Sequence, residues 1–258
     1  MADPIRLALR VLRAAAGLGA LLALTIPWLA ARKWPGARMA LANRGWDALL
    51  RGFGIRLDVS GTPQPGALFV ANHVSWTDIA LLARLTGAGF VAKREVGGWP
   101  LIGPLARRWG CILIDRERRL AAREQAGAVA RRLGEGTGLV IFPEGTTSDG
   151  SALLPFRSSL LAAAGRLEER MIQPVGIAYR HASGAPLSPE QRRRIAWLGE
   201  DALLPHALAL AADGGVRALV WFGPPIAIAC RKQAADHCRR AIAAWLAGDQ
   251  AATLNRAA

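Results

Sequence analysis

The stretch VANHVSWTDIALLARL, residues 70–85, changes from a strand pattern to a helix pattern within a few residues. It continues an apolar run that begins at residue 67, and its second half repeats apolar residues at helical spacing. His73 lies where the strand pattern ends, and Asp78 follows five residues later. The two ionisable side chains therefore belong either to a turn with a helix cap or to a functional site at a strand end.

The same alternation of strand and helix patterns continues along the chain. Strands are expected at residues 55–61, 67–72, 89–93, 111–115, 138–142, 172–179 and 216–223, with a further one at 192–197. Helices are expected at residues 78–85, 100–109, 117–133, 158–167, 204–212 and 232–248, and a polar loop at 180–194. The strands are short, apolar and rich in β-branched residues, as strands covered by helices on both faces are. The pattern predicts an α/β fold with a mostly parallel central sheet flanked by helices.

The charge balance is strongly basic. The 258 residues include 33 Lys and Arg against 19 Asp and Glu, a formal net charge of +14, and only three of the basic residues are lysines. Such a charge favours a polyanionic partner, which is either nucleic acid or an anionic membrane surface. Nucleic acid is disfavoured because the chain has one tyrosine and its aromatic residues do not interleave with the basic runs.

The N-terminal region indicates a membrane anchor. Residues 14–31 carry no charge, and arginines flank them on both sides. Roughly 18 apolar residues is the lower limit for crossing a bilayer, and the RKWPGAR run that follows, at residues 32–38, is basic and aromatic as membrane interfaces require. We expect a membrane-anchoring helical segment over residues 1–45 and a second domain over 46–258. Whether the helix spans the membrane or lies in its interface stays open, and a buried core helix is the alternative.

Cysteine and motif patterns exclude several classes of protein. The three cysteines, Cys111, Cys230 and Cys238, have no disulfide or zinc-ligand spacing. The chain also lacks a G-x-S-x-G elbow and a Walker A loop. No metal site and no bound redox cofactor are therefore expected.

Four strands end in abrupt changes from apolar to polar residues. These ends are NHVSWTD at 72–78, CILIDRE at 111–117, VIFPEGTTSDG at 140–150 and IQPVGI at 172–177. Ligand sites in open α/β sheets form at the carboxyl ends of strands. If the strands are neighbours, His73, Asp78, Arg116 and Glu144 converge there.

Each of these side chains suits a specific chemical task. A histidine whose ring is oriented by a carboxylate accepts a proton from an alcohol at neutral pH, so His73 and Asp78 are candidates for a general base and its partner. Arg116 suits a phosphate or a carboxylate, or else forms a surface salt bridge. Pro143 and Gly145 shape the turn that presents Glu144, although a plain turn explains this run as well.

In this order, NHVSWTD, CILIDR, FPEGT and IQPVGI resemble the four motifs of the glycerolipid acyltransferases, the lysophosphatidic acid acyltransferase family. The run AKREVGGWPLIG at 92–103 is similar to the K-x-E segment that precedes the second motif, and the resemblance covers roughly residues 50–230. It implies a glycerol-3-phosphate acyltransferase-like fold, with the acyltransferase domain at 46–258.

The resemblance also implies roles for individual residues. His73 would be the general base on the acceptor hydroxyl and Asp78 would orient it. The residues implied in substrate binding are Lys93, Arg116, Glu144, Gly145, Thr146 and Thr147. The residues implied in supporting the motifs are Asn72, Pro143 and Pro174.

The substrates implied are an acyl thioester, carried by CoA or by acyl carrier protein, and a lysolipid in the membrane. The family's third motif often continues with arginine, where this chain has Thr147. The runs around it resemble the lyso-ornithine lipid acyltransferase branch, so 1-acylglycerol-3-phosphate and lyso-ornithine lipid are both expected as acceptors, the former slightly ahead. A non-catalytic membrane-binding protein is the alternative from another class. The expected location is the inner membrane, with the catalytic domain on the cytoplasmic face.

Overall fold

The structure is a computed structural model that describes residues 3–114, 138–162, 171–199, 201–227 and 230–257. The strands are β1 (Ile55–Ser60), β2 (Leu68–Ala71), β3 (Gly89–Lys93), β4 (Ile112–Ile114), β5 (Leu139–Ile141), β6 (Met171–His181), β7 (Val216–Phe222) and β8 (Ile226–Ala227). The helices are α1 (Pro4–Ala30), α2 (Pro35–Gly52), α3 (Thr77–Thr86), α4 (Ile102–Trp109), α6 (Ser158–Ala162), α7 (Pro189–Ile195), α8 (Leu203–Ala212) and α9 (Arg231–Ala257), with 3-10 turns η1 (Ala31–Lys33) and η2 (Arg94–Gly98).

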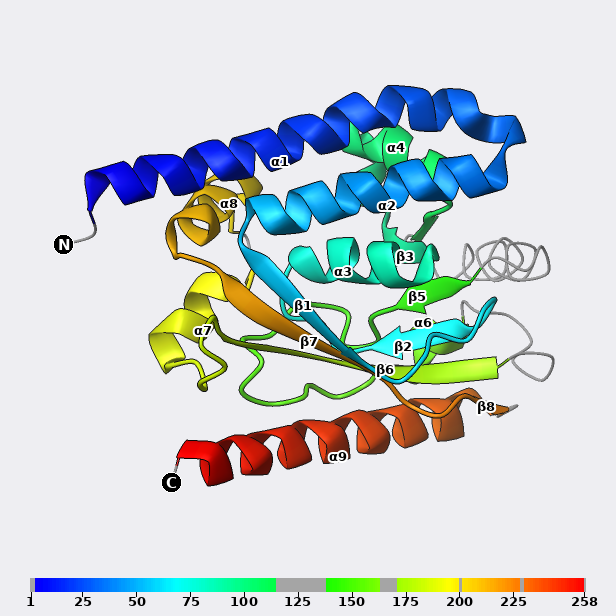
Figure 1. The fold of residues 1–258 in the computed structure, drawn as a ribbon. Helices are drawn as coiled ribbons and strands as arrows, with labels where there is room; N and C mark the ends of the chain where they lie inside the picture. The colour runs from blue at the N-terminus through cyan, green and yellow to red at the C-terminus, as the bar shows by residue number, and fades with distance from the viewer. Residues whose placement is uncertain (1–2, 115–137, 163–170, 200, 228–229, 258) are drawn as a thin grey trace.

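The strands form one sheet in the order β1-β7-β6-β2-β5-β3-β4, with β8 paired to the start of β6 (Figure 1). Strand pairs β1/β7, β6/β2, β2/β5, β5/β3 and β3/β4 are parallel, whereas β6 runs antiparallel to β7 and β8. The predicted α/β fold with a mostly parallel central sheet is confirmed. The carboxyl ends of β2, β5 and β3 consequently lie at one edge, which is the edge where the motif residues were expected to meet.

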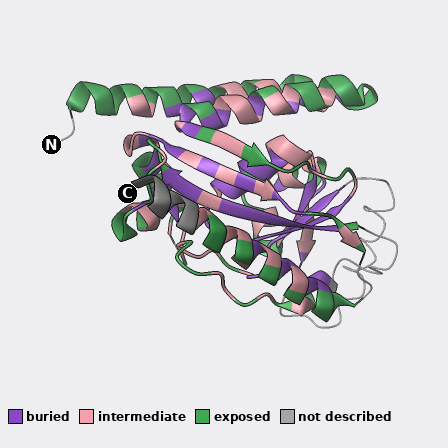
Figure 2. Cartoon of the chain, turned by 60° about the horizontal axis from the view of Figure 1, so that its bottom comes forward, coloured by how far each residue is buried: buried purple, intermediate pink, exposed green. Residues whose placement is uncertain are grey.

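Helices cover both faces of the sheet, with α2 and α3 on one side and α9 on the other (Figure 1). Phe69 of β2 enters the core shared with α2 and α3, while its neighbours Leu68 and Val70 enter the core shared with α9. Successive side chains of a strand point to opposite faces, so a fully apolar strand such as β2 has to be covered twice. Figure 2 shows the result, with buried strands in the middle and exposed outer faces on the helices.

The N-terminal helix α1 runs back along α2. A Cβ on Gly17 would lie 2.5 Å from the Ala48 carbonyl oxygen, so the close approach of the two helices depends on this glycine. Arg10 Nη1 donates to the Ala212 carbonyl (2.8 Å), which ties α1 to the end of α8. The expected boundary at residue 45 falls inside α2, which continues to Gly52 and leads directly into β1.

The segment 4–33, made of α1 and η1, is long and apolar enough to cross a membrane by length and composition. Only 22% of its most apolar window is buried. A core helix of a soluble domain buries most of its apolar surface, so this exposure disfavours the alternative of a buried core helix.

Two sequence-based expectations differ from the structure. Residues 192–197, expected as a strand, begin inside helix α7, because Ser188 and Gln191 form a capping box that starts a helix there. The expected loop at 180–194 is shorter for the same reason, and because β6 extends to His181. The helix expected at 117–133 and the second half of the one expected at 158–167 lie outside the described residues, and the first half is α6.

Candidate active site

The site begins where β2 ends. Asn72 directly follows the strand, and its side-chain amide donates to the Ile177 carbonyl (2.9 Å) and accepts from the Ile177 N–H (2.7 Å). The side chain thereby takes the place of a β-ladder partner for β6 at the point where the β2 backbone turns away. This turn brings His73, the next residue, to the carboxyl edge of the sheet.

His73 and Asp78 are in direct contact and form the pair that we call the dyad. His73 Nδ1 lies 2.8 Å from Asp78 Oδ2, and the same oxygen accepts the backbone N–H groups of Val74 (2.7 Å) and Ser75 (2.9 Å). Asp78 is fully buried in the first turn of α3. Because a carboxylate only accepts hydrogen bonds, it fixes the proton on Nδ1 and leaves Nε2 as the basic nitrogen.

A third side chain, Tyr179 of β6, completes the network around Asp78. Its hydroxyl donates to Asp78 Oδ1 (2.6 Å) and lies 2.6 Å from Thr77 Oγ1. Burial raises the pKa of the Tyr179 phenol well above its ordinary value, so it stays a donor. Sequence reasoning missed this residue, although it is the only tyrosine in the chain and lies in the strand of the fourth motif.

Glu144 lies behind His73. Its Oε1 accepts the His73 backbone N–H (2.8 Å) and its Oε2 accepts the Leu154 N–H (3.1 Å). The side chain is 2% exposed, and this burial raises its pKa to about 7. Both carboxylate oxygens therefore accept backbone N–H groups of the protein itself. The motif resemblance implied a different contact, between Glu144 and the acceptor substrate.

The ring of His73 stacks on Phe142, with centroids 3.9 Å apart and planes at 13°. Phe142 directly follows β5, and β5 and β6 are the two strands that neighbour β2 in the sheet. Residues from both neighbours of β2 therefore position the histidine. Ser148 N donates to the His73 carbonyl (2.9 Å), which fastens the loop after β5 to the same turn. Sequence reasoning missed Phe142 as well, because an apolar residue before a motif is ordinarily assigned to the core.

The loop after β5 carries the remaining residues of the third motif. Gly145 adopts φ +75°, the left-handed region that favours glycine, and the Pro143 carbonyl accepts from Arg157 N (2.9 Å). Thr146 is exposed, whereas the Thr147 hydroxyl donates to the Trp197 carbonyl. Thr147 thus joins this loop to the segment after α7.

The structure describes two of the three remaining predicted site residues, Lys93 and Pro174. Lys93 is exposed at the end of β3, at the same edge of the sheet as His73. Pro174 is paired with Val70 inside the sheet, so it supports the strand and does not face the edge. Arg116 lies outside the described residues. No group of three or more His, Cys, Asp or Glu side chains able to hold a metal ion occurs in the described part of the chain.

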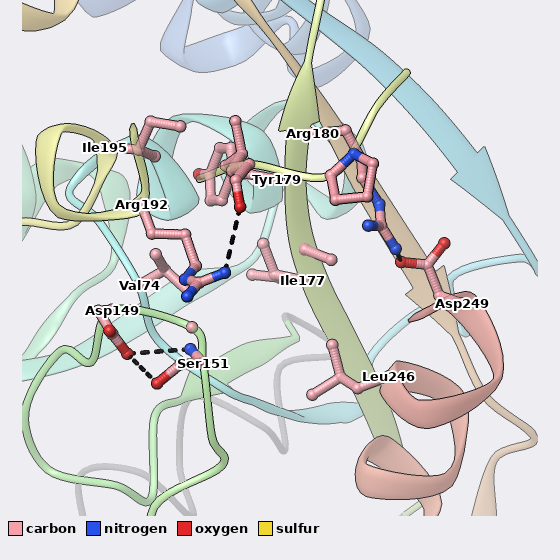
Figure 3. A pocket seen from close by; sticks show the side chains of 14 residues that line it. Val74, Asp149, Ser151, Ile177, Tyr179, Arg180, Arg192, Ile195, Leu246 and Asp249 are labelled. Carbon is pink, nitrogen blue, oxygen red and sulfur yellow. Dashed lines mark hydrogen bonds and ion pairs between the residues drawn. The ribbon is translucent and has the colours of Figure 1, made fainter. Parts of the chain in front are cut away.

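A cavity of about 380 Å³ lies beside the turn that carries His73 (Figure 3). Val74, which follows the histidine, lines it together with residues of β6, α7, α9 and the loop at 149–151. The cavity is lined by two arginines and two aspartates, so its charges balance. Arg180 forms a salt bridge with Asp249. Asp149 faces the half-buried Arg192, and the described contacts include no salt bridge between these two side chains. Arg192 Nε is buried and has no hydrogen-bond partner within the described residues.

A histidine held at a strand end by a buried carboxylate, on an α/β sheet covered by helices, defines a candidate site for proton transfer to or from a substrate hydroxyl. The Acyltransferase family model matches residues 56–178, which include both residues of this dyad. The chain is 35% identical over 199 residues to the lyso-ornithine lipid O-acyltransferase of Brucella abortus (strain 2308), covering 74% of each chain. It is 36% identical over 129 residues to the 1-acyl-sn-glycerol-3-phosphate acyltransferase of Neisseria gonorrhoeae, covering 47% of this chain and 51% of the relative.

The fold has a solved counterpart. The 1-acyl-sn-glycerophosphate acyltransferase PlsC from Thermotoga maritima superimposes with a TM-score of 0.62 at 19% identity, covering 93% of this chain and 95% of that one. The chain belongs to the family of lysophosphatidic acid and lysolipid acyltransferases and is an acyltransferase. The family expected from the motifs is confirmed, and the apolar N-terminal helix together with this family membership points to association with a membrane.

Proposed function

We propose that this acyltransferase moves a fatty acyl group from a thioester to the hydroxyl of a lysolipid, with His73 as general base and Asp78 as the residue that orients it. The observation that carries the proposal is the 2.8 Å contact between His73 Nδ1 and the buried Asp78 carboxylate. It leaves Nε2 as the nitrogen that accepts the hydroxyl proton. Imidazole has an ordinary pKa near neutrality and is suited to this step.

The proposed reaction proceeds through a tetrahedral intermediate. As His73 Nε2 takes the proton, the hydroxyl oxygen attacks the thioester carbonyl, and Asp78 stabilises the imidazolium that forms. The intermediate collapses by breaking the carbon–sulfur bond, and the thiolate leaves with the proton that His73 returns. The products are an ester of the lysolipid and a free thiol, and no metal or bound redox cofactor is required because the thioester is already activated.

The proposed donor is acyl-CoA or an acyl carrier protein thioester. Both carriers are anionic, and the net charge of +14 favours their approach. Lys93, exposed at the sheet edge that carries His73, and Arg116 are the proposed contacts for anionic groups of the substrates. The proposed role of Glu144 is to accept the His73 backbone N–H and so to position the histidine, and not to contact the lysolipid.

The proposed acceptor is lyso-ornithine lipid, and three observations support it. The lyso-ornithine relative matches 74% of this chain, against 47% for the 1-acylglycerol-3-phosphate relative. The neutral Thr147, whose hydroxyl already bonds the Trp197 carbonyl, adds no charge for a phosphate. The charge-balanced cavity beside His73 suits the carboxylate and ammonium of an amino-acid head group, with Arg192 and Asp149 as their proposed partners. 1-Acylglycerol-3-phosphate is the second candidate.

The proposed location is the inner membrane, with the catalytic domain on the cytoplasmic face. The helix α1 is fastened to the domain by Gly17 and by the Arg10 and Arg13 side chains, which donate to main-chain carbonyls of α8 and α2. A helix attached along its length to a domain at the surface favours a position in the membrane interface over one that crosses the bilayer. All three cysteines are free thiols, which fits a reducing compartment.

An acceptor panel tests the proposal. The purified protein, in detergent, receives labelled acyl-CoA or acyl carrier protein thioester with either lysolipid, and His73→Ala serves as the control for each pair. We expect diacylated product from lyso-ornithine lipid, abolished in the variant. Product from 1-acylglycerol-3-phosphate alone would move the enzyme to the second candidate, and absence of product from both acceptors would contradict the lysolipid proposal.

A further inference from the structure

The turn between η2 and α4 exposes a cluster of large apolar side chains, which we call the α4 tip and define as residues 99–102. Trp99 is 36% exposed, Leu101 72% and Ile102 39%. Leu101 also has φ +64° and ψ −48°, the strained central position of a γ-turn, which a leucine rarely adopts. An exposed apolar residue in a strained backbone conformation has no evident role in folding, so the tip requires another explanation.

The α4 tip is firmly attached to the domain. Within it, Gly103 N donates to the Trp99 carbonyl (3.0 Å) and Ile102 N to the Pro100 carbonyl (2.7 Å). At the far end of α4, Trp109 stacks on Trp28 of α1 with centroids 5.7 Å apart. The apolar side chains are therefore presented outward by a helix that is packed at its other end.

Basic residues flank the tip in the sequence. The segment 93–109 contains Lys93, Arg94, Arg107 and Arg108 against a single acidic residue, Glu95. All four basic residues are exposed. Apolar and aromatic side chains flanked by basic ones are characteristic of surfaces that enter the interface of an anionic membrane.

The other end of α4, at Arg108 and Trp109, adjoins the corner between α1 and α2. Arg38 of α2 donates from Nη2 to the Arg108 carbonyl (3.0 Å), and Trp34, which lies between η1 and α2, is 64% exposed. Arg32 and Lys33 precede Trp34 and add further positive charge to this corner. α4 thus extends from this basic corner to the α4 tip.

The tip is also linked to the dyad. Trp99 packs edge-on against Trp197 with centroids 6.3 Å apart, and Trp197 N donates to the Val74 carbonyl (3.1 Å), beside His73. We propose that the α4 tip inserts into an anionic phospholipid leaflet as a second membrane contact, separate from α1, and holds the leaflet against the sheet edge that carries His73. The net charge of +14 and the basic flanks identify the leaflet, and not a second protein, as the occupant.

Fluorescence of a probe at the tip tests this inference without using activity. Leu101→Cys, labelled with an environment-sensitive dye in a Cys111→Ser, Cys230→Ser background, is compared with Met171→Cys in the same background. Met171 is 38% exposed at the start of β6, on the opposite edge of the sheet. On vesicles that contain phosphatidylglycerol, we expect blue-shifted emission and quenching by brominated lipids at position 101 and neither change at 171.

Equal responses at the two positions, or no quenching at 101, would overturn the proposal. A response at 101 that depends on protein concentration without vesicles would also overturn it, because it would identify a second copy as the occupant.

A second variant separates membrane insertion from folding. Leu101→Gly removes the apolar side chain and relieves the strained conformation, so the variant should be at least as stable as the wild type in thermal unfolding. We expect it to bind anionic vesicles about tenfold more weakly, since an exposed leucine loses its lipid contact. Unchanged vesicle affinity in a stable Leu101→Gly protein would contradict the inference.

Discussion

The substitution Asp78→Asn separates the charge of the carboxylate from its structural role. An asparagine carbonyl at the position of Oδ2 still accepts from His73 Nδ1 and the two backbone N–H groups. Its amide group would face Tyr179, whose hydroxyl proton is able to turn to Thr77 Oγ1 at 2.6 Å. We therefore expect the fold and the histidine tautomer to persist.

The lost quantity is the attraction between the carboxylate and the imidazolium formed in the reaction. At the observed 2.8 Å, two unit charges attract by about 6 kcal/mol at an effective dielectric constant of about 20. The dipole of the asparagine amide restores part of this attraction, so the net loss of transition-state stabilisation is about 4–5 kcal/mol. Since each 1.36 kcal/mol is about tenfold in rate, kcat should fall about 10³- to 10⁴-fold.

The assay is the rate of acyl transfer at saturating thioester and lysolipid, with thermal unfolding as the control for folding. A folded Asp78→Asn enzyme whose kcat stays within about tenfold of the wild type would contradict the proposed role of the Asp78 charge. Such a result would mean that no imidazolium forms beside residue 78.

Three further predictions follow from buried groups and close contacts. Tyr179→Phe removes the hydroxyl that donates to Asp78 Oδ1, so the Asp78 carboxylate holds a proton on the His73 imidazole more strongly. The acid limb of the kcat/KM profile should therefore shift to higher pH, and an unchanged profile would mean that Tyr179 contributes packing alone. Burial raises the pKa of Glu144 from its ordinary 4.5 to about 7, so the folded protein binds more protons than the unfolded chain in this range and the free energy of unfolding falls as pH rises through it. Urea unfolding at about pH 5 and about pH 8 should show a smaller fall for Glu144→Gln, and an equal fall would contradict the assignment. Gly17→Leu should separate α1 from α2, because a Cβ at this position would lie 2.5 Å from the Ala48 carbonyl oxygen. We expect faster proteolysis near residue 33 in this variant. An unchanged rate of proteolysis would contradict the predicted separation.

Much of the fold was predictable because its strands are covered on both faces. The continuous apolar run of β2 and its abrupt polar end follow from two layers of helices and one open edge, and both features are visible in the sequence. The antiparallel placement of β6 beside β7 was not predictable, because apolar strand patterns carry no direction. The helix at α7 was missed because its three consecutive arginines hide an amphipathic pattern, although Ser188 and Gln191 signalled its start.

The candidate site was predictable where chemistry requires a fixed spacing. Asp78 reaches back to His73 because the turn and the first turn of α3 bring residues five apart into contact. Partners from distant strands were not predictable in this way, since Tyr179 joins the dyad through the sheet order alone. The inward position of Glu144 also depends on tertiary packing, because a carboxylate after a strand has the same sequence pattern whether it faces solvent or backbone.

The most direct test of the central claim is the rate of thioester-dependent acylation of a lysolipid by wild-type protein and by His73→Ala. We expect diacylated product from the wild type and a rate at least about 10²-fold lower from a variant that unfolds at the same temperature. Substantial transfer by a well-folded His73→Ala protein would contradict the assignment of His73 as the general base.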